Sequence, residues 1–230
     1  MKKILLPATL CMFISTALEA QFVFGETIGV LQQKVAEDST LYPRIVERFV
    51  NNDTTLTLNE LSLLYYGSAF IPGYDALQEE RILDAGSSLA RREKYDLAIG
   101  LFDNFLGRNP ACLRGLLEKG YTHWLTKDSL IAEPTYQRYY QLLQVPLKSG
   151  TGESPEKAFV LRSIQDEDLV LNELGWLIQG ESLLERNGQY FNKANCIKED
   201  NQNTTRDFYF NVDLPLKWGK ERTPQKKGGN

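Results

Sequence analysis

The chain has 230 residues, with 26 basic and 30 acidic side chains and a formal net charge of −4. This length allows one domain or two small ones. The chain is 42% hydrophobic and 11% aromatic, which is enough to bury a core and excludes wholesale disorder. The mildly negative charge argues against nucleic-acid binding as the main task, so we expect no nucleic-acid partner.

The first twenty residues predict a secretory signal peptide. Lys2 and Lys3 precede an almost wholly apolar run at residues 4–18, and the segment ends at Ala20. This order is typical of an export signal, whereas a buried N-terminal helix explains it less well. The run is too short to span a bilayer, which takes about 20 apolar residues. We expect cleavage after Ala20, a mature charge of −5 and a soluble periplasmic or secreted protein without stable membrane insertion.

Residues 21–148 are predicted to form a helical region, because apolar residues recur at helical spacing. Thr57 and Glu60 fit a capping box, in which each side chain satisfies a backbone N–H at a helix start. Gly67 is expected to cap the end of the same helix. The helices expected here cover residues 31–38, 43–50, 57–67, 82–89, 95–106 and 113–124.

The last three of these helices resemble tetratricopeptide repeats. In that family, pairs of antiparallel helices recur about every 34 residues, with a small residue at the close helix crossing and a proline at the end. Gly86, Ala98, Phe102 and Pro110 fall at this spacing, and Gly120 lies 34 residues after Gly86. The resemblance implies a partner surface on the concave side of the hairpins.

The second repeat is incomplete. Ala132 and Tyr136 fit the spacing, but Pro134 is expected to interrupt the helix. About one and a half repeats are present, and an independent solenoid normally needs at least three. We therefore expect a core of helical hairpins, and an ordinary helical bundle fits the pattern equally well.

The composition changes at Ser149, and residues 149–218 are predicted to form an α+β region. Asn187 and Gly188 form a two-residue hairpin signal between segments of period two. Residues 208–214 alternate apolar and polar, which indicates a half-buried antiparallel strand that Pro215 ends. The segments expected before these strands are a turn at 149–152, a helical turn or short strand at 158–161 and a short helix from Asp166 to Gly175.

We therefore expect an α+β fold in which tetratricopeptide-like helical hairpins are followed by a small antiparallel β-sheet. Residues 21–148 and 149–218 are expected to pack as one composite domain. The tail at residues 219–230 lacks an apolar anchor and is expected to be disordered.

Four segments together resemble one family of exported proteins from Bacteroides-type bacteria. They are NNDTTLT at residues 51–57 with Glu60, LYYG at 64–67, GTGESPEKAF at 150–159 and FYFNVDLP at 208–215. The family is the exported domain of unknown function (4919) family. The resemblance implies export and one composite domain, and it supplies no catalytic residue.

No residue pattern predicts a catalytic, cofactor-binding or metal-binding site. Nucleophilic hydrolysis needs a base beside the nucleophile, and the one histidine, His123, is interpreted as an ordinary helix residue. Zinc needs three or four suitable ligands. Cys112 and Cys196, which remain after signal cleavage, are interpreted as separate buried thiols, with one disulfide as the alternative. The acidic residues 166–168 fit a helix N-terminus better than a calcium loop.

Our leading hypothesis is an exported, non-catalytic interaction or scaffold module with a protein partner in the periplasm or cell envelope. The partner surface is expected between Gly86 and Tyr140, by analogy of fold. The alternative is a small hydrolase or binding protein that acts on envelope or dietary glycans through a carboxylate pair about 5–10 Å apart. Tyr65-Tyr66, Tyr139-Tyr140 and Phe208-Tyr209-Phe210 each place aromatic rings on two faces, and an exposed ring would favour contacts with a partner or a sugar. Core packing and sheet stability are the favoured interpretation of these rings.

Overall fold

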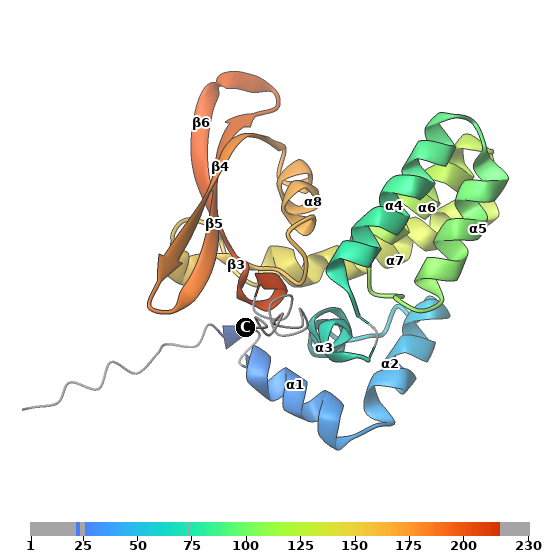
Figure 1. Cartoon of the computed structure of the whole chain (residues 1–230), viewed down its shortest axis with the longest axis horizontal. Coiled ribbons are helices and arrows are strands. Elements are labelled where there is room, and N and C mark those ends of the chain that lie inside the picture. The colour runs from blue at the N-terminus through green and yellow to red at the C-terminus, as the bar shows by residue number, and fades with distance from the viewer. Residues whose placement is uncertain (1–21, 24–25, 73, 217–230) are drawn as a thin grey trace, which may run out of the picture.

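The computed structural model describes residues 22–23, 26–72 and 74–216 (Figure 1). The predicted signal peptide at residues 1–20 and the predicted disordered tail at 219–230 lie outside the described residues. In chain order the elements are β1 (Phe22–Val23), β2 (Glu26–Thr27), α1 (Ile28–Glu37), α2 (Leu41–Val50), α3 (Leu58–Gly67), η1 (Ser68–Phe70), α4 (Ala76–Arg91), α5 (Tyr95–Leu106), α6 (Leu113–Leu125), α7 (Ser129–Lys148), η2 (Pro155–Lys157), β3 (Phe159–Val160), α8 (Asp166–Glu173), β4 (Trp176–Arg186), β5 (Gln189–Lys198) and β6 (Asn201–Asn211).

Helix α3 begins at the capping box that the sequence predicts. The hydroxyl of Thr57 accepts the backbone N–H of Glu60 at 3.3 Å, and the Glu60 carboxylate accepts the N–H of Thr57 at 2.8 Å. The C-terminal cap expected at Gly67 was wrong, because Gly67 is helical with φ −60° and the chain runs on into η1. A side chain at Gly67 would lie 3.0 Å from Val35 and 3.3 Å from Tyr42, so its small size lets α1, α2 and α3 pack closely.

Helices α4–α7 form two antiparallel hairpins in one arm of the molecule (Figure 1). Each hairpin has its closest approach at a glycine. A Cβ on Gly86 would lie 2.3 Å from the Phe102 ring of α5, and a Cβ on Gly120 would lie 3.1 Å from the Tyr136 ring of α7. The small residues therefore lie where the spacing placed the helix crossings, while the likeness to tetratricopeptide repeats stays a prediction.

Helix α7 corrects the interruption expected at Pro134. The helix runs through 20 residues with Pro134 and Pro146 inside it. Pro134 is only the sixth residue, so its missing N–H leaves a single carbonyl without an intrahelical donor, that of Leu130. Because Leu130 is 85% exposed, this turn of the helix is open to water, which can supply the lost hydrogen bond.

The C-terminal sheet has the order β3-β6-β5-β4, with antiparallel β4–β5 and β5–β6 pairs. Asn187 and Gly188 turn between β4 and β5 with φ of +53° and +74°, as their sequence predicts. The expected sheet was wholly antiparallel, but the short β3 pairs in parallel with the end of β6. Strand β6 ends at Asn211 rather than at Pro215, and Val212 is buried beyond the strand.

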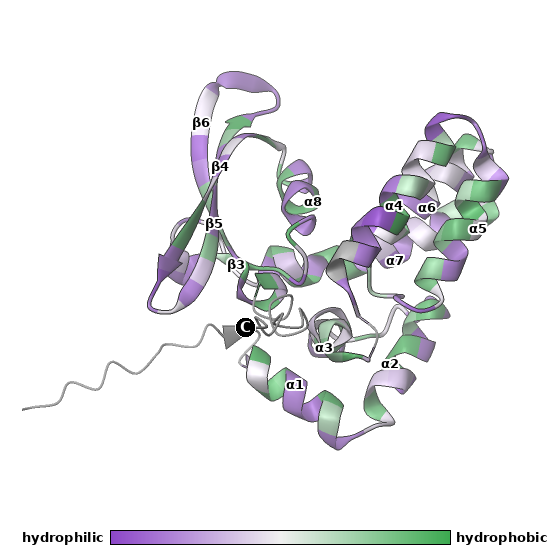
Figure 2. Cartoon of the chain, viewed as in Figure 1, coloured by the Kyte–Doolittle hydropathy of each residue, from purple (hydrophilic) through white to green (hydrophobic). Residues whose placement is uncertain are grey.

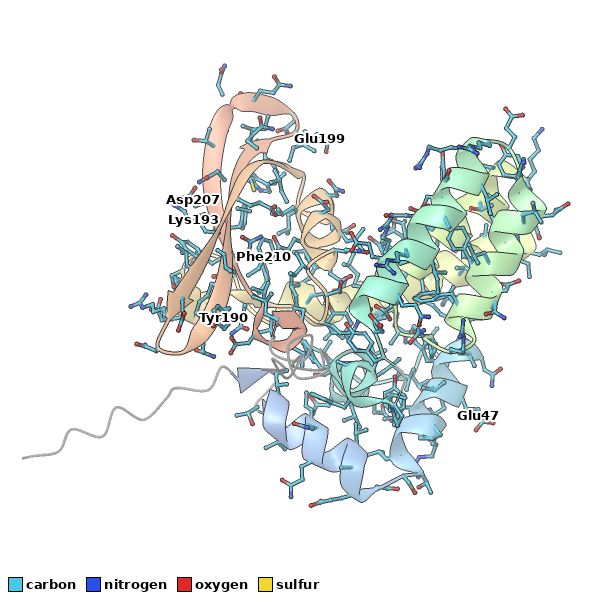
Figure 3. The ribbon with its side chains drawn as sticks, in the orientation of Figure 1. Glu47, Tyr190, Lys193, Glu199, Asp207 and Phe210 are labelled. Carbon is cyan, nitrogen blue, oxygen red and sulfur yellow. The ribbon has the colours of Figure 1, made fainter. Side chains whose placement is uncertain are left out.

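The sheet has one outward and one buried face. Figure 3 shows Lys193 and Asp207 beside each other on the face turned away from the helices, where they form an ion pair of 2.7 Å. Phe210 and Phe208 of β6 are buried against Phe159 of β3.

One hydrophobic core joins the two halves of the chain. It draws on α1–α3, α6 and α7 from the helical region and on β3, α8, β5 and β6 from the α+β region. A smaller cluster lies between α4 and α5. Figure 2 shows hydrophilic residues at the two tips of the molecule, in the α4–α5 and β5–β6 turns, and hydrophobic residues along the outer helix α5.

Candidate functional site

Four aromatic side chains gather on the exposed side of α6 and α7, and we call Tyr121, Trp124, Tyr136 and Tyr140 the aromatic surface. The Tyr121 and Trp124 rings are stacked, with centroids 5.9 Å apart and planes 18° apart. Trp124 is 61%, Tyr140 50% and Tyr121 47% exposed. Burial raises the pKa of Tyr136, and the nearby Tyr140 and Tyr121 raise it further.

Helical spacing explains the aromatic surface. Tyr121 and Trp124 are three residues apart on α6, and Tyr136 and Tyr140 are four apart on α7, so each pair lies on one side of its helix. Tyr139 points the other way into the core and meets the Tyr140 ring edge-on, with centroids 5.1 Å apart. This doublet therefore has one buried and one exposed ring, which is the alternative to core packing of both rings.

The other doublet follows the favoured interpretation of core packing, because Tyr65 and Tyr66 are both fully buried. The Tyr65 hydroxyl donates to the Asp166 carboxylate at 2.6 Å and accepts the backbone N–H of Arg162 at 3.2 Å. The Tyr66 hydroxyl donates to the carbonyl of Val160 at 3.0 Å. These bonds tie α3 to the start of the α+β region, so both rings serve the fold.

A buried ion pair continues this network. The Arg162 guanidinium donates to both carboxylate oxygens of Glu79 on α4, at 3.0 and 3.2 Å, and lies over the Tyr74 ring. Arg162 is 1% and Glu79 5% exposed. Burial is the largest single effect and lowers the pKa of Arg162, but Glu79, Tyr74, Cys112 and Asp166 together hold it well above the usual value. Burial raises the pKa of Asp166 to about 6 against the opposing effect of Arg162. Among the described residues Arg162 Nε has no hydrogen-bond partner, but the two bonds to Glu79 join α4 to the segment before α8.

A carboxyl pair lies where α8 meets the sheet. The Asn192 amide on β5 donates to Glu167 of α8 at 2.8 Å and to Glu181 of β4 at 3.2 Å. Burial raises the pKa of Glu167 to about 9, and Glu181 adds to the rise. Glu167 is therefore protonated at neutral pH. The acidic first turn does open a helix, as predicted. However, the helix terminus alone would lower the pKa of Glu167, so burial is the larger effect here.

This pair has one feature of a glycosidase site and lacks another. Hydrolysis of a glycoside uses a pair of carboxyl groups, one of which is held protonated and acts as the acid. A substrate must also reach the acid, and Glu167 is only 2% exposed in this structure. In the conformation described, Asn192 is hydrogen-bonded to both carboxyl groups, and a substrate has no access to Glu167.

The histidine and the cysteines lie at separate buried positions. His123 lies in the last turn of α6, and its Nδ1 is 3.1 Å from the carboxylate of Asp128, the residue before α7. Cys112 and Cys196 are buried free thiols, so the alternative of one disulfide is not realised. Burial raises the pKa of Cys112 to about 12 and that of Cys196 to about 11, which keeps both thiols protonated. Within the described ranges, no three His, Cys, Asp or Glu side chains are arranged to hold a metal ion.

Two cavities lie outside the aromatic surface. One, of about 330 Å³, opens between the segment that follows η1, helix α4 and the end of α5, and its lining includes Tyr74, Glu79 and Arg108. The second, of about 350 Å³, lies between α1, α2 and α3. Sequence reasoning missed both, because their walls come from helices whose contacts no local pattern encodes. Among the helices of residues 26–72 and 74–216, none is long and apolar enough to cross a bilayer.

A family model described as Domain of unknown function (DUF4919) matches residues 30–220. The match runs from α1 past the end of the sheet and confirms the family that the four sequence segments resemble. The Bacteroides-type origin stays a prediction. Neither a curated protein nor a solved structure matches the chain.

Proposed function

The chain belongs to the family Domain of unknown function (DUF4919), whose description assigns no activity, and from the geometry we propose an exported, non-catalytic interaction module. Its partner is a protein, bound through the aromatic surface of α6 and α7. The supporting observation is that Tyr121, Trp124 and Tyr140 each leave about half of the side chain or more in water on adjoining helices. Isolated exposed apolar residues are ordinary, but a cluster of them marks a binding surface.

The residue types favour a protein partner. Tyrosine and tryptophan are enriched in the buried centres of protein interfaces, because a rigid ring buries much area at a small cost in side-chain entropy. Apolar surface continues at the start of α7, where Leu130 and Ile131 are also exposed. The proposed partner surface is therefore the second hairpin, α6 and α7, within the wider region expected between Gly86 and Tyr140.

The proposed location is the periplasm or the outside of the cell. Support comes from the charged, apolar and small segments in residues 1–20. Mass spectrometry of the protein isolated from cells should find a new N-terminus at Gln21. Finding the intact N-terminus in the cytosol would remove this part of the proposal.

Site-specific photo-crosslinking in cells tests the interaction. A photoreactive residue replaces Trp124 on the aromatic surface, and in a matched protein it replaces Leu97, which is equally exposed on α5. We expect one protein to crosslink from position 124 and not from position 97. The proposal is wrong if both positions give the same products or if position 124 gives none.

The carboxyl pair supports a second candidate, a hydrolase that acts on envelope or dietary glycans. The observation in its favour is the protonated Glu167 beside Glu181. The purified protein and a Glu167→Gln variant, which keeps the shape of the side chain and an oxygen that accepts from Asn192, are compared on such polysaccharides. Turnover by the native protein that disappears in the variant would establish the hydrolase. An interaction module gives no turnover with either protein.

A further inference from the structure

Strand β4 lies at one end of the strand order β3-β6-β5-β4 and pairs with β5 along its length. After an irregularity between Ile178 and Gly180, the register is regular up to the hairpin turn. Residues 181–186 are all exposed, and Leu183 is 59% exposed. Within the described part of the chain, no backbone hydrogen bond joins residues 181–186 to a segment other than β5.

The outer side of such a strand is a template for a further strand, because every second residue directs its N–H and C=O groups away from the sheet. Proteins that keep an edge unpaired commonly protect it with proline, lysine, a bulge or a short strand. Residues 181–186 contain neither proline nor lysine, and the irregularity of β4 lies before them. This part of the edge is therefore open to pairing.

The charge beside the edge selects which strand can be added. Glu181 and Glu185 point to one face of the sheet with Leu183 between them, because side chains alternate along a strand. Asp168 of α8 lies near Glu181: burial raises the pKa of Asp168, and the charge of Glu181 raises it further. Among the described residues, none of these three carboxylates forms an ion pair. Basic side chains on this face of an added strand are therefore favoured.

A second copy of this chain fits the edge less well. Pairing β4 with β4 of a copy about a two-fold axis brings the acidic faces of both copies to the same side of the joined sheet. With Leu183 opposite itself, Glu181 of each copy would lie opposite Glu185 of the other, and like charges across strands are destabilising. The charges therefore favour a different, basic segment.

We propose that residues 181–186 bind an extended basic segment of another protein as a fifth strand of the sheet. Backbone hydrogen bonds hold the segment, and its alternating side chains give specificity. Opposite Glu181, Leu183 and Glu185 the segment carries a basic, an apolar and a basic residue. This contact lies on the sheet and does not depend on the aromatic surface of α6 and α7.

Nuclear magnetic resonance titration of the protein with a capped basic peptide, Glu-Lys-Val-Val-Thr-Lys, tests the added strand. Antiparallel to β4, this peptide places lysines opposite Glu181 and Glu185 and a valine opposite Leu183. We expect the largest amide shifts in β4, and binding about tenfold weaker for the acidic peptide Glu-Glu-Val-Val-Thr-Glu. Equal binding of the two peptides, or shifts confined to α6 and α7, would overturn the proposal.

Methylated peptides show whether the backbone pairs. Methylation of the backbone nitrogens at peptide positions 1, 3 and 5 removes the N–H groups on one edge of the extended peptide, and methylation at 2, 4 and 6 removes those on the other. Only one edge can face β4, so one methylated peptide should lose binding and the other should keep it. The same effect of both methylation patterns would exclude strand addition.

A charge exchange locates the contact on the protein. Glu185→Lys should weaken binding of the basic peptide about threefold or more, and glutamate at peptide position 2, opposite residue 185, should recover it. Glu199→Lys is the control, because Figure 3 shows Glu199 and Tyr190, the partner of Glu185 in the register, at opposite ends of the sheet. Equal affinity of the native protein and Glu185→Lys, or no binding up to about 1 mM peptide, would contradict docking at this edge.

Discussion

Glu79 and Arg162 form the most deeply buried ion pair described, and its value to the fold depends on both partners being present. Glu79→Leu leaves the guanidinium buried without its carboxylate, which costs about 3–5 kcal/mol of unfolding free energy. Urea denaturation, followed by circular dichroism, measures this cost.

A double variant separates pairing from packing. Replacing Glu79 with Leu and Arg162 with Met removes both charges, so the double variant should be more stable than the Glu79→Leu protein. A Glu79→Leu protein within about 1 kcal/mol of the native one would show that the pair does not anchor α4 to the α+β region.

Glu167 makes stability depend on pH. Its folded pKa of about 9 lies above the ordinary 4.5, so the unfolded chain releases this proton at a lower pH than the folded chain does. Between those two values, rising pH therefore favours the unfolded state by up to about tenfold in the equilibrium constant per pH unit. Glu167→Gln keeps the shape of the side chain and an oxygen that accepts from Asn192, without a proton to lose.

We expect the Glu167→Gln variant to be more stable than the native protein, by a margin that grows from pH 5 to pH 9. Urea midpoints measured across this range check the effect. Parallel curves for the two proteins would mean that Glu167 is ionised in the folded state.

At the scale of elements, the first helical hairpin depends on one glycine. In Gly86→Ala the new Cβ would lie 2.3 Å from Phe102, so the ring or the helix must move, at a cost of about 1–3 kcal/mol. Gly100→Ala on α5 is the matched control, because nothing lies within 4 Å of its Cβ and alanine favours the helix by about 1 kcal/mol.

In thermal unfolding, the midpoint temperature should therefore be lower than that of the native protein for Gly86→Ala and higher for Gly100→Ala. Destabilisation by both substitutions to the same extent would contradict a close crossing at Gly86. Phe102→Leu in the Gly86→Ala background should recover part of the loss, because the smaller side chain leaves room for the methyl group.

Elements with a local signal could be predicted from the sequence. The capping box of Thr57 and Glu60 and the turn of Asn187 and Gly188 each satisfy backbone groups within a few residues, so the sequence alone carries the information. The prediction that Pro134 interrupts the helix was wrong, because the missing N–H removes only one hydrogen bond, close to an exposed helix start.

Features that depend on distant contacts could not be predicted. Glu79 and Arg162 are 83 residues apart, and no periodicity relates them. The acidic residues at the start of α8 predicted a helix terminus but not its burial, because Glu167 is buried by packing against β4 and by its hydrogen bond with Asn192 of β5. Only part of the aromatic surface could be predicted from the sequence. The doublet Tyr139-Tyr140 indicated an exposed ring, but Tyr121 and Trp124 come close to Tyr140 only because α6 packs on α7.

At the scale of the whole molecule, one core connects the helical arm to the sheet. We therefore expect the two to unfold together, because neither can open without exposing apolar surface of the other. Hydrogen exchange in rising urea should show α3 and β6 merging into one opening reaction. Separate reactions that stay apart up to the unfolding midpoint would divide the chain into two independent units.

Binding of a protein by the aromatic surface is measured by titration with the partner that crosslinking identifies. Trp124→Ala removes the most exposed ring of the surface, and Leu97→Ala makes a comparable change on α5. An interface centre built on this ring predicts an affinity loss of about tenfold or more for Trp124→Ala and little change for Leu97→Ala. Equal affinity of the native protein and the Trp124→Ala variant would show that the partner does not bind through the aromatic surface.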